Sequence, residues 1–285
     1  MIIEGDIIVP VDFYEQVGAQ AVWATNFWPN GIVPFEFDAN VTVANQQLML
    51  VAMADWENVA NVDFRPRSGE ANYVHIQGST ENSSEVGRMQ GGQQVIKIFN
   101  WNWEFIMAHE LGHALGLWHE QSRSDRDDYV IINTNNITSG QGYNFDKHDS
   151  ADVCPKQAYN LPGVETYDFD SVMHYGQCAF SRCDPNAGCT GTPLTTIDVK
   201  PAYSVWQNLI GQRTHLSDPD ELTMSFLYPE SDWRFVDRRI TVARRMGPSS
   251  SITSSSPAAQ VQSPRGVLCG SNRVLTPRSE HTTRP

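Results

Sequence analysis

The sequence predicts an α+β protein in which a mixed sheet packs against a long helix. Residues 44–60 (ANQQLMLVAMADWENVA) are rich in alanine, lack glycine and proline, and place apolar side chains on a recurring face, which predicts a helix. An alternating stretch from Phe35 precedes this helix. Three short segments between Gly, Ser and Asn turns then predict strands: VDFRPR (62–67), NYVHIQG (72–78) and QQVIKIFN (93–100). Strands after a long helix are typical of a sheet with that helix on one face.

Two further helices are expected, with irregular chain between them. Residues 104–117 (EFIMAHELGHALGL) predict a helix that ends at Gly116. Beyond Asp125 the periodic pattern fades, which predicts loops as far as Pro219. Residues 218–229 (DPDELTMSFLYP) predict the last helix, with an aspartate as its N-cap.

Composition divides the 285 residues into three regions, and the whole is long enough to bury a substantial core. Residues 1–20 are acidic and end in the small, polar GAQ, so we expect a leader that lies outside the main fold. Residues 21–230 hold the predicted helices and strands and form the main domain. Residues 231–285, with SSSITSSSP and many arginines, predict a disordered tail whose role stays open.

Charge is spread unevenly along the chain. Residues 231–285 contain nine arginines, no lysine and three acids, so their formal charge is +6. Because the net charge of the whole chain is −13, the first 230 residues carry −19. A strongly acidic body argues against a nucleic-acid-binding surface. It suits a soluble monomer, and no apolar run approaches the roughly 18 residues that span a membrane. We therefore expect neither nucleic acid nor membrane as a partner.

Five cysteines (Cys154, Cys178, Cys183, Cys189 and Cys269) leave the redox compartment open by count alone. Cys183 and Cys189 flank the turn-rich DPNAG, which predicts a small disulfide loop. Cys154 and Cys178 are the candidates for a second disulfide bond. The alternative is a set of free thiols in a reducing compartment.

The stretch HELGHALGLWHE has the spacing of a metal site. On a helix, His109 and His113 lie one turn apart on one face, so both can reach one ion. Glu110 is rotated by about 100° from His109, which suits holding a water molecule better than joining the ligands. Glycine at Gly116 permits the sharp turn that brings His119 back to the same ion. Three neutral imidazoles leave a fourth position open, as in catalytic zinc sites.

A surface helix with merely polar histidines is the simpler alternative. Leu111, Ala114, Leu115 and Leu117 supply an apolar face, so the helix itself requires no metal. This alternative leaves the joint placement of the glutamate, the glycine and the third histidine without an explanation.

HELGHALGLWHEQSRSDRDDYV resembles the astacins, a metzincin branch with the signature HExxHxxGxxHE. YDFDSVMHYG (167–176) is similar to their Met-turn, and residues 28–38, 62–67 and 86–93 also lie where the family has similar stretches. The resemblance covers roughly residues 22–229. It implies a two-lobed metzincin catalytic domain. Long helices and a twisted mixed sheet form the N-terminal lobe, the C-terminal lobe is irregular, and the active-site cleft lies between them.

By this resemblance the chain is a secreted zinc metalloendopeptidase that acts on protein or peptide substrates with one catalytic Zn²⁺. Glu110 is the implied base that takes the proton of a water whose pKa zinc lowers to about 7. Tyr175 is the implied phenol that ligates zinc at rest and then stabilises the oxyanion. Met173 forms the hydrophobic floor, and Glu120 is a structural support. The implied zinc ligands are His109, His113 and His119.

The leader carries a candidate inhibitory switch. Asp6, in IIEGDI, resembles the FxGD motif of astacin pro-segments, in which the aspartate takes the water position on zinc; here isoleucine replaces the phenylalanine. An ordinary acidic turn is the alternative, since Gly-Asp is a common turn pair. The resemblance implies a zymogen activated by another protease or by autoproteolysis. No Lys or Arg precedes the expected mature start between Gly18 and Val22, which argues against a trypsin-like activator.

Several features depart from the family pattern or stay open. The positions of the usual family disulfides hold no cysteine, so the cysteines after the Met-turn are interpreted as a relocated disulfide on the cleft rim that alters the subsites. The residues Val86, Gly87 and Arg88 are candidates for the edge strand that pairs with a substrate. MIIEGDIIVP lacks the pattern of a secretory signal.

Two other classes of function stay open. The first is a zinc-binding, non-catalytic protein-interaction module, which would normally lose Glu110. The second is a zinc hydrolase of a non-peptide substrate, which ligand geometry alone does not exclude.

Overall fold

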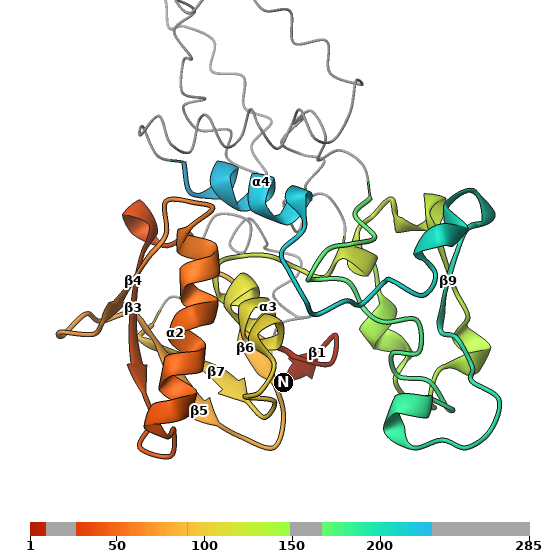
Figure 1. The fold of residues 1–285 in the computed structure, drawn as a ribbon, viewed down its shortest axis with the longest axis horizontal. Helices are drawn as coiled ribbons and strands as arrows, with labels where there is room; N and C mark the ends of the chain where they lie inside the picture. The colour runs from red at the N-terminus through yellow and green to blue at the C-terminus, as the bar shows by residue number, and fades with distance from the viewer. Residues whose placement is uncertain (10–26, 90, 149–166, 230–285) are drawn as a thin grey trace, which may run out of the picture.

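The computed structural model describes residues 1–9, 27–89, 91–148 and 167–229. Its larger sheet is mixed and has the strand order β1-β2-β6-β7-β5-β3-β4 (Figure 1). Parallel pairing joins β3 to β4 and β5, β5 to β7, and β2 to β6, whereas β1–β2 and β6–β7 are antiparallel. The strands are β1 (Ile2–Ile3), β2 (Ile7–Ile8), β3 (Ile32–Phe37), β4 (Asp63–Pro66), β5 (Tyr73–Gly78), β6 (Ser83–Glu85) and β7 (Gln93–Ile98).

Helices α2 (Val43–Glu57) and α3 (Glu104–Ala114) lie side by side against this sheet (Figure 1). Both expected helices are confirmed, and their apolar side chains share one core with the strands. Thr42 caps α2 by accepting a hydrogen bond from the amide of Asn45 at 3.2 Å. Trp56 donates its indole hydrogen to the carbonyl of Ala108 at 2.8 Å, which ties α2 to α3. The helix that carries the first two histidines is therefore fixed by the core of the N-terminal lobe.

Helix α4 (Asp218–Leu227) confirms the last expected helix but corrects its cap. Ser217 is the N-cap, because its hydroxyl accepts from the amide of Asp220 at 3.0 Å while the Asp220 carboxylate accepts from the Ser217 amide. Asp218 is the first helical residue, so an aspartate N-cap was wrong. Asp220, at the third helical position, completes a reciprocal capping box.

The first nine residues correct the expectation that the leader lies outside the main fold. Strand β2 pairs with β6, with Ile7 opposite Ser84 and Ile8 opposite Glu85. The side chains of Ile3, Ile7, Val9 and Val86 form a small buried cluster of their own. The short strand β6 otherwise presents free backbone groups at the sheet edge, and an extended apolar segment satisfies them.

The C-terminal lobe is irregular, but it is not only loops. Strands β8 (Val130–Ile132) and β9 (Ile197–Val199) pair antiparallel over a second core. Three residues are too few to show a period in the sequence, so these strands were missed. Figure 1 places β1 between this lobe and the lobe with the larger sheet. Short 3₁₀ helices span Pro29–Gly31, Glu120–Ser122, Arg126–Asp128, Thr134–Asn136, Gly142–Phe145, Pro185–Ala187 and Pro201–Trp206.

The predicted disulfide loop is confirmed by the bond between Cys183 and Cys189. Cys178 makes no disulfide bond with another described residue, and Cys154, its suggested partner, lies outside the described residues, so that pairing stays a prediction. In the part of the chain that the structure describes, every helix is too short or too polar to cross a membrane.

Candidate active site

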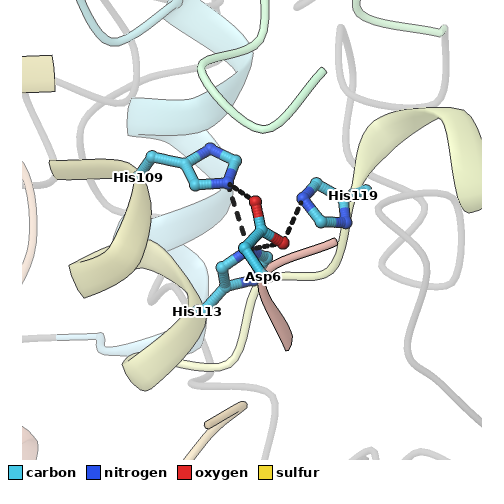
Figure 2. A group of neighbouring side chains, drawn as sticks. All are labelled: Asp6, His109, His113 and His119. Atoms are coloured by element: carbon cyan, nitrogen blue, oxygen red, sulfur yellow. Dashed lines mark hydrogen bonds and ion pairs between the residues drawn. The ribbon is translucent and has the colours of Figure 1, made fainter. Parts of the chain in front are cut away.

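Three histidines and one leader carboxylate meet between the lobes (Figure 2). His109 and His113 point from one face of α3, His119 points from the chain that follows it, and Asp6 enters from the leader. Each of the four residues offers one nitrogen or oxygen atom, and these atoms all lie within 4.8 Å of one another. The three imidazoles are buried. The structure therefore brings together the residues predicted as zinc ligands and as the switch.

The turn at Gly116 returns the third histidine to the other two. Gly116 has φ of +113°, and its amide donates to the carbonyl of His113 at 2.8 Å. A β-carbon added at Gly116 would lie 3.2 Å from the ring of Phe27. This backbone conformation and this close contact both favour glycine, and the turn directs the chain back towards His119.

Hydrogen bonds set which ring nitrogens of the first two histidines are free. His109 Nδ1 lies 2.7 Å from the carbonyl of Val172, and His113 Nδ1 lies 2.8 Å from the carbonyl of Leu117. Because a carbonyl only accepts, each Nδ1 carries a proton, and Nε2 of each neutral ring holds a lone pair. Burial lowers the pKa of His109 to about 3, so this ring is neutral. The two Nε2 atoms nevertheless face each other at 3.2 Å, which a shared cation would stabilise.

The leader carboxylate completes the donor set. Asp6 Oδ2 lies 3.3 Å from His109 Nε2, and Asp6 Oδ1 lies 3.6 Å from His113 Nε2 and 3.1 Å from His119 Nε2. Asp6 Oδ1 and His119 Nε2 are buried, and neither makes a hydrogen bond within the described residues. Ligands at 2.0–2.1 Å from a tetrahedral zinc ion stand about 3.3 Å apart. The separations, the lone pairs and the donor types therefore fit one zinc ion.

Glu110 is buried beside this cluster, on the same helix as His109. Its Oε2 has no hydrogen-bond partner in the described part of the chain. Burial, and then the negative charge of Asp6, raise the pKa of Glu110 well above its usual value. Glu110 lines a cavity of about 370 Å³ together with Asp6, His109, Tyr175 and Arg213. A base at this position faces the space in which a substrate would meet the metal.

The Met-turn packs under the histidine helix and is fixed by α4. Met173 is fully buried in the core of the N-terminal lobe, and its carbonyl accepts from the amide of Glu120. Asp220 of α4 accepts from the hydroxyl of Ser171 at 2.7 Å and from the amide of Val172 at 2.8 Å. The carboxylate that caps α4 therefore also holds the turn whose carbonyl orients His109.

Tyr175 contacts both the third histidine and the leader. Its ring centroid lies 4.6 Å from that of His119, and its hydroxyl donates to the backbone carbonyl of Glu4. Burial, followed by the charges of Asp6 and Glu4, raises the pKa of Tyr175 well above its usual value, so its hydroxyl remains a donor. Its amide donates to Gln121 at 2.9 Å.

Glu120 differs from Glu110 in its partners. Its Oε1 accepts from Arg123 Nη1 at 3.0 Å and from the amide of Asp168 at 2.8 Å. These bonds join the chain after the third histidine to the chain before the Met-turn. The position of Glu120 is consistent with the expected support of the site.

The edge strand of the sheet lies just before the residues suggested for substrate pairing. Strand β6 ends at Glu85, and β2 of the leader occupies its free edge. Val86 is buried, and the amide of Gly87 donates to the carbonyl of His113 at 2.8 Å. A role for Val86, Gly87 and Arg88 in substrate pairing stays a prediction.

Sequence reasoning missed Glu4. Its buried carboxylate accepts from His119 Nδ1 and from the Ser122 hydroxyl, each at 2.8 Å, and also contacts His148 Nε2. Burial raises the pKa of Glu4, but His148 and His119 outweigh it and lower the value to about 2. Burial lowers the pKa of His119, but Asp6 and then Glu4 raise it to about 9. An acid two residues before Asp6 was the only signal, and it is not a specific one.

Arg213 was also missed, because no local pattern marks it. It lines the same cavity as Glu110, and its Nη1 donates to the carbonyls of His174 at 3.1 Å and Gln212 at 2.8 Å. Burial lowers the pKa of its guanidinium. Within the described residues it makes no ion pair with a carboxylate, so a positive charge remains at the cavity.

Curated relatives match most of this chain. The chain is 39% identical to bone morphogenetic protein 1 of Xenopus laevis over 203 residues, which are 70% of this chain and 27% of that protein. It is 34% identical to meprin A subunit beta of Rattus norvegicus over 227 residues, 79% of this chain and 29% of that one. The chain thus spans less than a third of the length of these relatives.

A solved structure and a protein family also match the chain. High choriolytic enzyme 1, a hatching enzyme zinc-protease from Oryzias latipes, has 30% sequence identity and a TM-score of 0.56, over 77% of this chain and 96% of that one. This match confirms the expected α+β metzincin fold. Residues 21–229 match the peptidase family Astacin. With the histidine cluster, the turn at Gly116 and the buried glutamate, this match shows that the chain belongs to the astacin family, whose members use one catalytic zinc ion.

Proposed function

We propose that the chain is a zinc-dependent endopeptidase that hydrolyses peptide bonds in protein or peptide substrates. The observation that carries this proposal is the convergence of three imidazole nitrogens beside Glu110, a buried carboxylate with an unpartnered oxygen. His109, His113 and His119 would hold the ion. When bound, zinc supplies Lewis acidity towards a carbonyl or a water molecule.

Two side chains carry the proton and the charge in this proposal. Glu110 takes a proton from the attacking water while the water oxygen bonds to the scissile carbonyl carbon, and it delivers that proton to the amine as the carbon–nitrogen bond breaks. Tyr175, once released from the carbonyl of Glu4, donates its hydroxyl hydrogen to the oxyanion. Arg213 offers a buried positive charge in the same cavity, which supports a substrate with an acidic side chain beside the scissile bond.

The leader holds this site closed in our proposal. Asp6 occupies the open position among the histidines. The carbonyl of Glu4 accepts the hydrogen bond of the Tyr175 hydroxyl, which is then not available to a substrate. Gly5 lies between Glu4 and Asp6 and has φ of +80°, a conformation that favours glycine. A larger residue would also not fit there, because an added β-carbon would lie 2.5 Å from the ring of Phe180. Residues 1–20 would then be a pro-segment, removed by another protease or by autoproteolysis. The Cys183–Cys189 bond supports secretion into an oxidising compartment.

The test compares leader-free protein with its Glu110→Ala variant on casein and on a peptide library, with zinc per chain measured in both. We expect cleavage by the first, none by the second, and equal zinc. Equal cleavage by both proteins would overturn the mechanism. Bound zinc without any cleavage would favour a non-catalytic binding module. Hydrolysis of small esters alone would favour a hydrolase of non-peptide substrates.

A further inference from the structure

A second cavity of about 530 Å³ adjoins the proposed active site. Its volume is in the range of ligand-binding pockets, about 300–1,000 Å³. The chain after the Met-turn lines it together with Asn208, Ile210 and Gly211, and Ala179 lines both cavities. The two cavities therefore meet at Ala179.

The backbone that separates the two cavities is thin. Tyr175 and Arg213 line the first cavity, whereas Gly176 and Gly211 line the second. The backbones at Gly176 and Gly211 are so close that a β-carbon on Gly211 would overlap Gly176. Neighbouring substrate residues can thus place their side chains on opposite sides of this contact.

The disulfide loop holds one wall of the second cavity in place. Cys183 and Cys189 close the loop, and the amide of Leu194 donates to the carbonyl of Cys183 at 3.1 Å. Within the loop, Oδ1 of Asp184 accepts from the amide of Asn186 at 2.8 Å and so caps the 3₁₀ turn Pro185–Ala187. The carboxylate of Asp184 is therefore presented by a closed, hydrogen-bonded loop.

Asp184 is the single charged residue among the described residues that line this cavity. It makes no ion pair with any residue in the described part of the chain. Asp184 is half-buried and lines the cavity together with Cys178. Burial raises the pKa of the Cys178 thiol, and the charge of Asp184 raises it further. Uncharged polar side chains such as Gln177, Thr195 and Asn208 complete the lining.

We infer that this second cavity is a substrate subsite that selects a lysine or arginine side chain, with the Asp184 carboxylate as its recognition group. This inference rests on the proposed endopeptidase function. A cation in the cavity would pair with the one carboxylate there, and the neutral polar side chains would accept its remaining hydrogen bonds. The substrate class is thus a peptide with a basic residue within a few positions of the scissile bond.

The test uses leader-free protein and a set of peptides around one fixed scissile bond. Each flanking position in turn carries Lys, Gln or Glu, and kcat/KM is measured for each peptide. At one position we expect the Lys peptide to be cleaved about fivefold faster than the Gln peptide. In Asp184→Asn, which keeps an oxygen to cap the turn, this ratio should fall to about one. Asp128→Asn, a change of the same type at an exposed acid outside both cavities, should keep the ratio.

Binding of the same peptides to the Glu110→Gln variant, followed by fluorescence anisotropy, separates the subsite from catalysis. A Lys-to-Gln affinity ratio that disappears with Asp184→Asn supports the subsite even if no peptide is cleaved, whereas absence of all cleavage overturns the proposed function. A ratio unchanged by Asp184→Asn, or no preference for Lys at any position, overturns the subsite alone. Asp184→Ser, which also caps the turn, repeats the test if the first variant misfolds.

Discussion

The α3 side of the site and the C-terminal side differ in what holds their functional side chains in place. On the α3 side, His109, Glu110 and His113 are held by one helix that packs against α2 and the sheet. On the C-terminal side, Tyr175 and Arg213 lie on chain without regular structure and are held by a few hydrogen bonds, among them bonds to the distant residues Gln121 and His174. The leader contacts both sides, through β2 on one and through Glu4 on the other.

This difference suggests a division of tasks. A helix fixes the spacing between ligands within a few residues of sequence, which suits the binding of a metal ion. Irregular chain brings together residues from distant parts of the sequence, which suits the contacts that open or close the active site and select the substrate. If this division holds, substitutions on the α3 side should weaken zinc binding, and substitutions on the C-terminal side should lower the rate of hydrolysis without loss of zinc.

The largest expected effect is on the C-terminal side. In leader-free protein, Tyr175→Phe should lower kcat/KM about 100-fold, because the oxyanion loses a donor, while zinc per chain stays unchanged. Tyr203→Phe, at a half-exposed tyrosine of the same lobe, should leave both quantities unchanged. Loss of zinc from Tyr175→Phe would contradict the division, because metal binding would then depend on the irregular side.

Gly116→Ala should produce the opposite pattern on the α3 side. An alanine at φ of +113° and 3.2 Å from Phe27 displaces the turn, so His119 no longer reaches the ion at its proper distance. We expect zinc affinity to fall by about 10- to 100-fold, measured by competition with a chelator. Gly140→Ala is the matched control. It imposes a similar strain at φ of +82°, where no atom lies within 4 Å of the added carbon, and should leave zinc affinity unchanged.

The same division explains what could be predicted from the sequence. The helices, the longer strands and the metal spacing are local patterns, so residues 44–60 and 104–117 predicted α2 and α3 closely. The roles of Glu4 and Asp220 depend on contacts with residues far away in the chain, which no window of sequence contains. Strands β8 and β9 were missed because three residues show no period.

A smaller effect is expected in the leader, where the Glu4 carboxylate contacts His119 and His148. In full-length protein, Glu4→Gln removes the charge that His119 and His148 contact, so the leader should dissociate more readily and basal activity should rise about tenfold. Casein cleavage before and after addition of an activating protease measures this rise. Glu81→Gln, at an exposed acid, is the matched control. Unchanged basal activity in Glu4→Gln would show that the Glu4 carboxylate does not help to hold the leader in place.

The smallest expected effect concerns a carboxyl pair between α2 and α3. Burial, and then the charge of Glu104, raise the pKa of Asp55 to about 6. The folded state binds the proton of Asp55 more tightly than the unfolded state does. The contribution of this proton to the free energy of unfolding is therefore complete below the unfolded pKa of about 4 and is lost as the pH rises through about 6.

Asp55→Asn should therefore leave stability similar at pH 4 and increase it by about 1 kcal/mol at pH 8, a value reduced for the partial exposure of the group. Urea unfolding at the two pH values measures this difference. Asp128→Asn, at an exposed acid outside the pair, should show no pH-dependent gain. Equal gains in both variants would mean that net charge, and not the contact between α2 and α3, sets the effect. A gain confined to Asp55→Asn would show that the α3 side, although regular, carries an electrostatic cost at the start of the helix that holds the metal ligands.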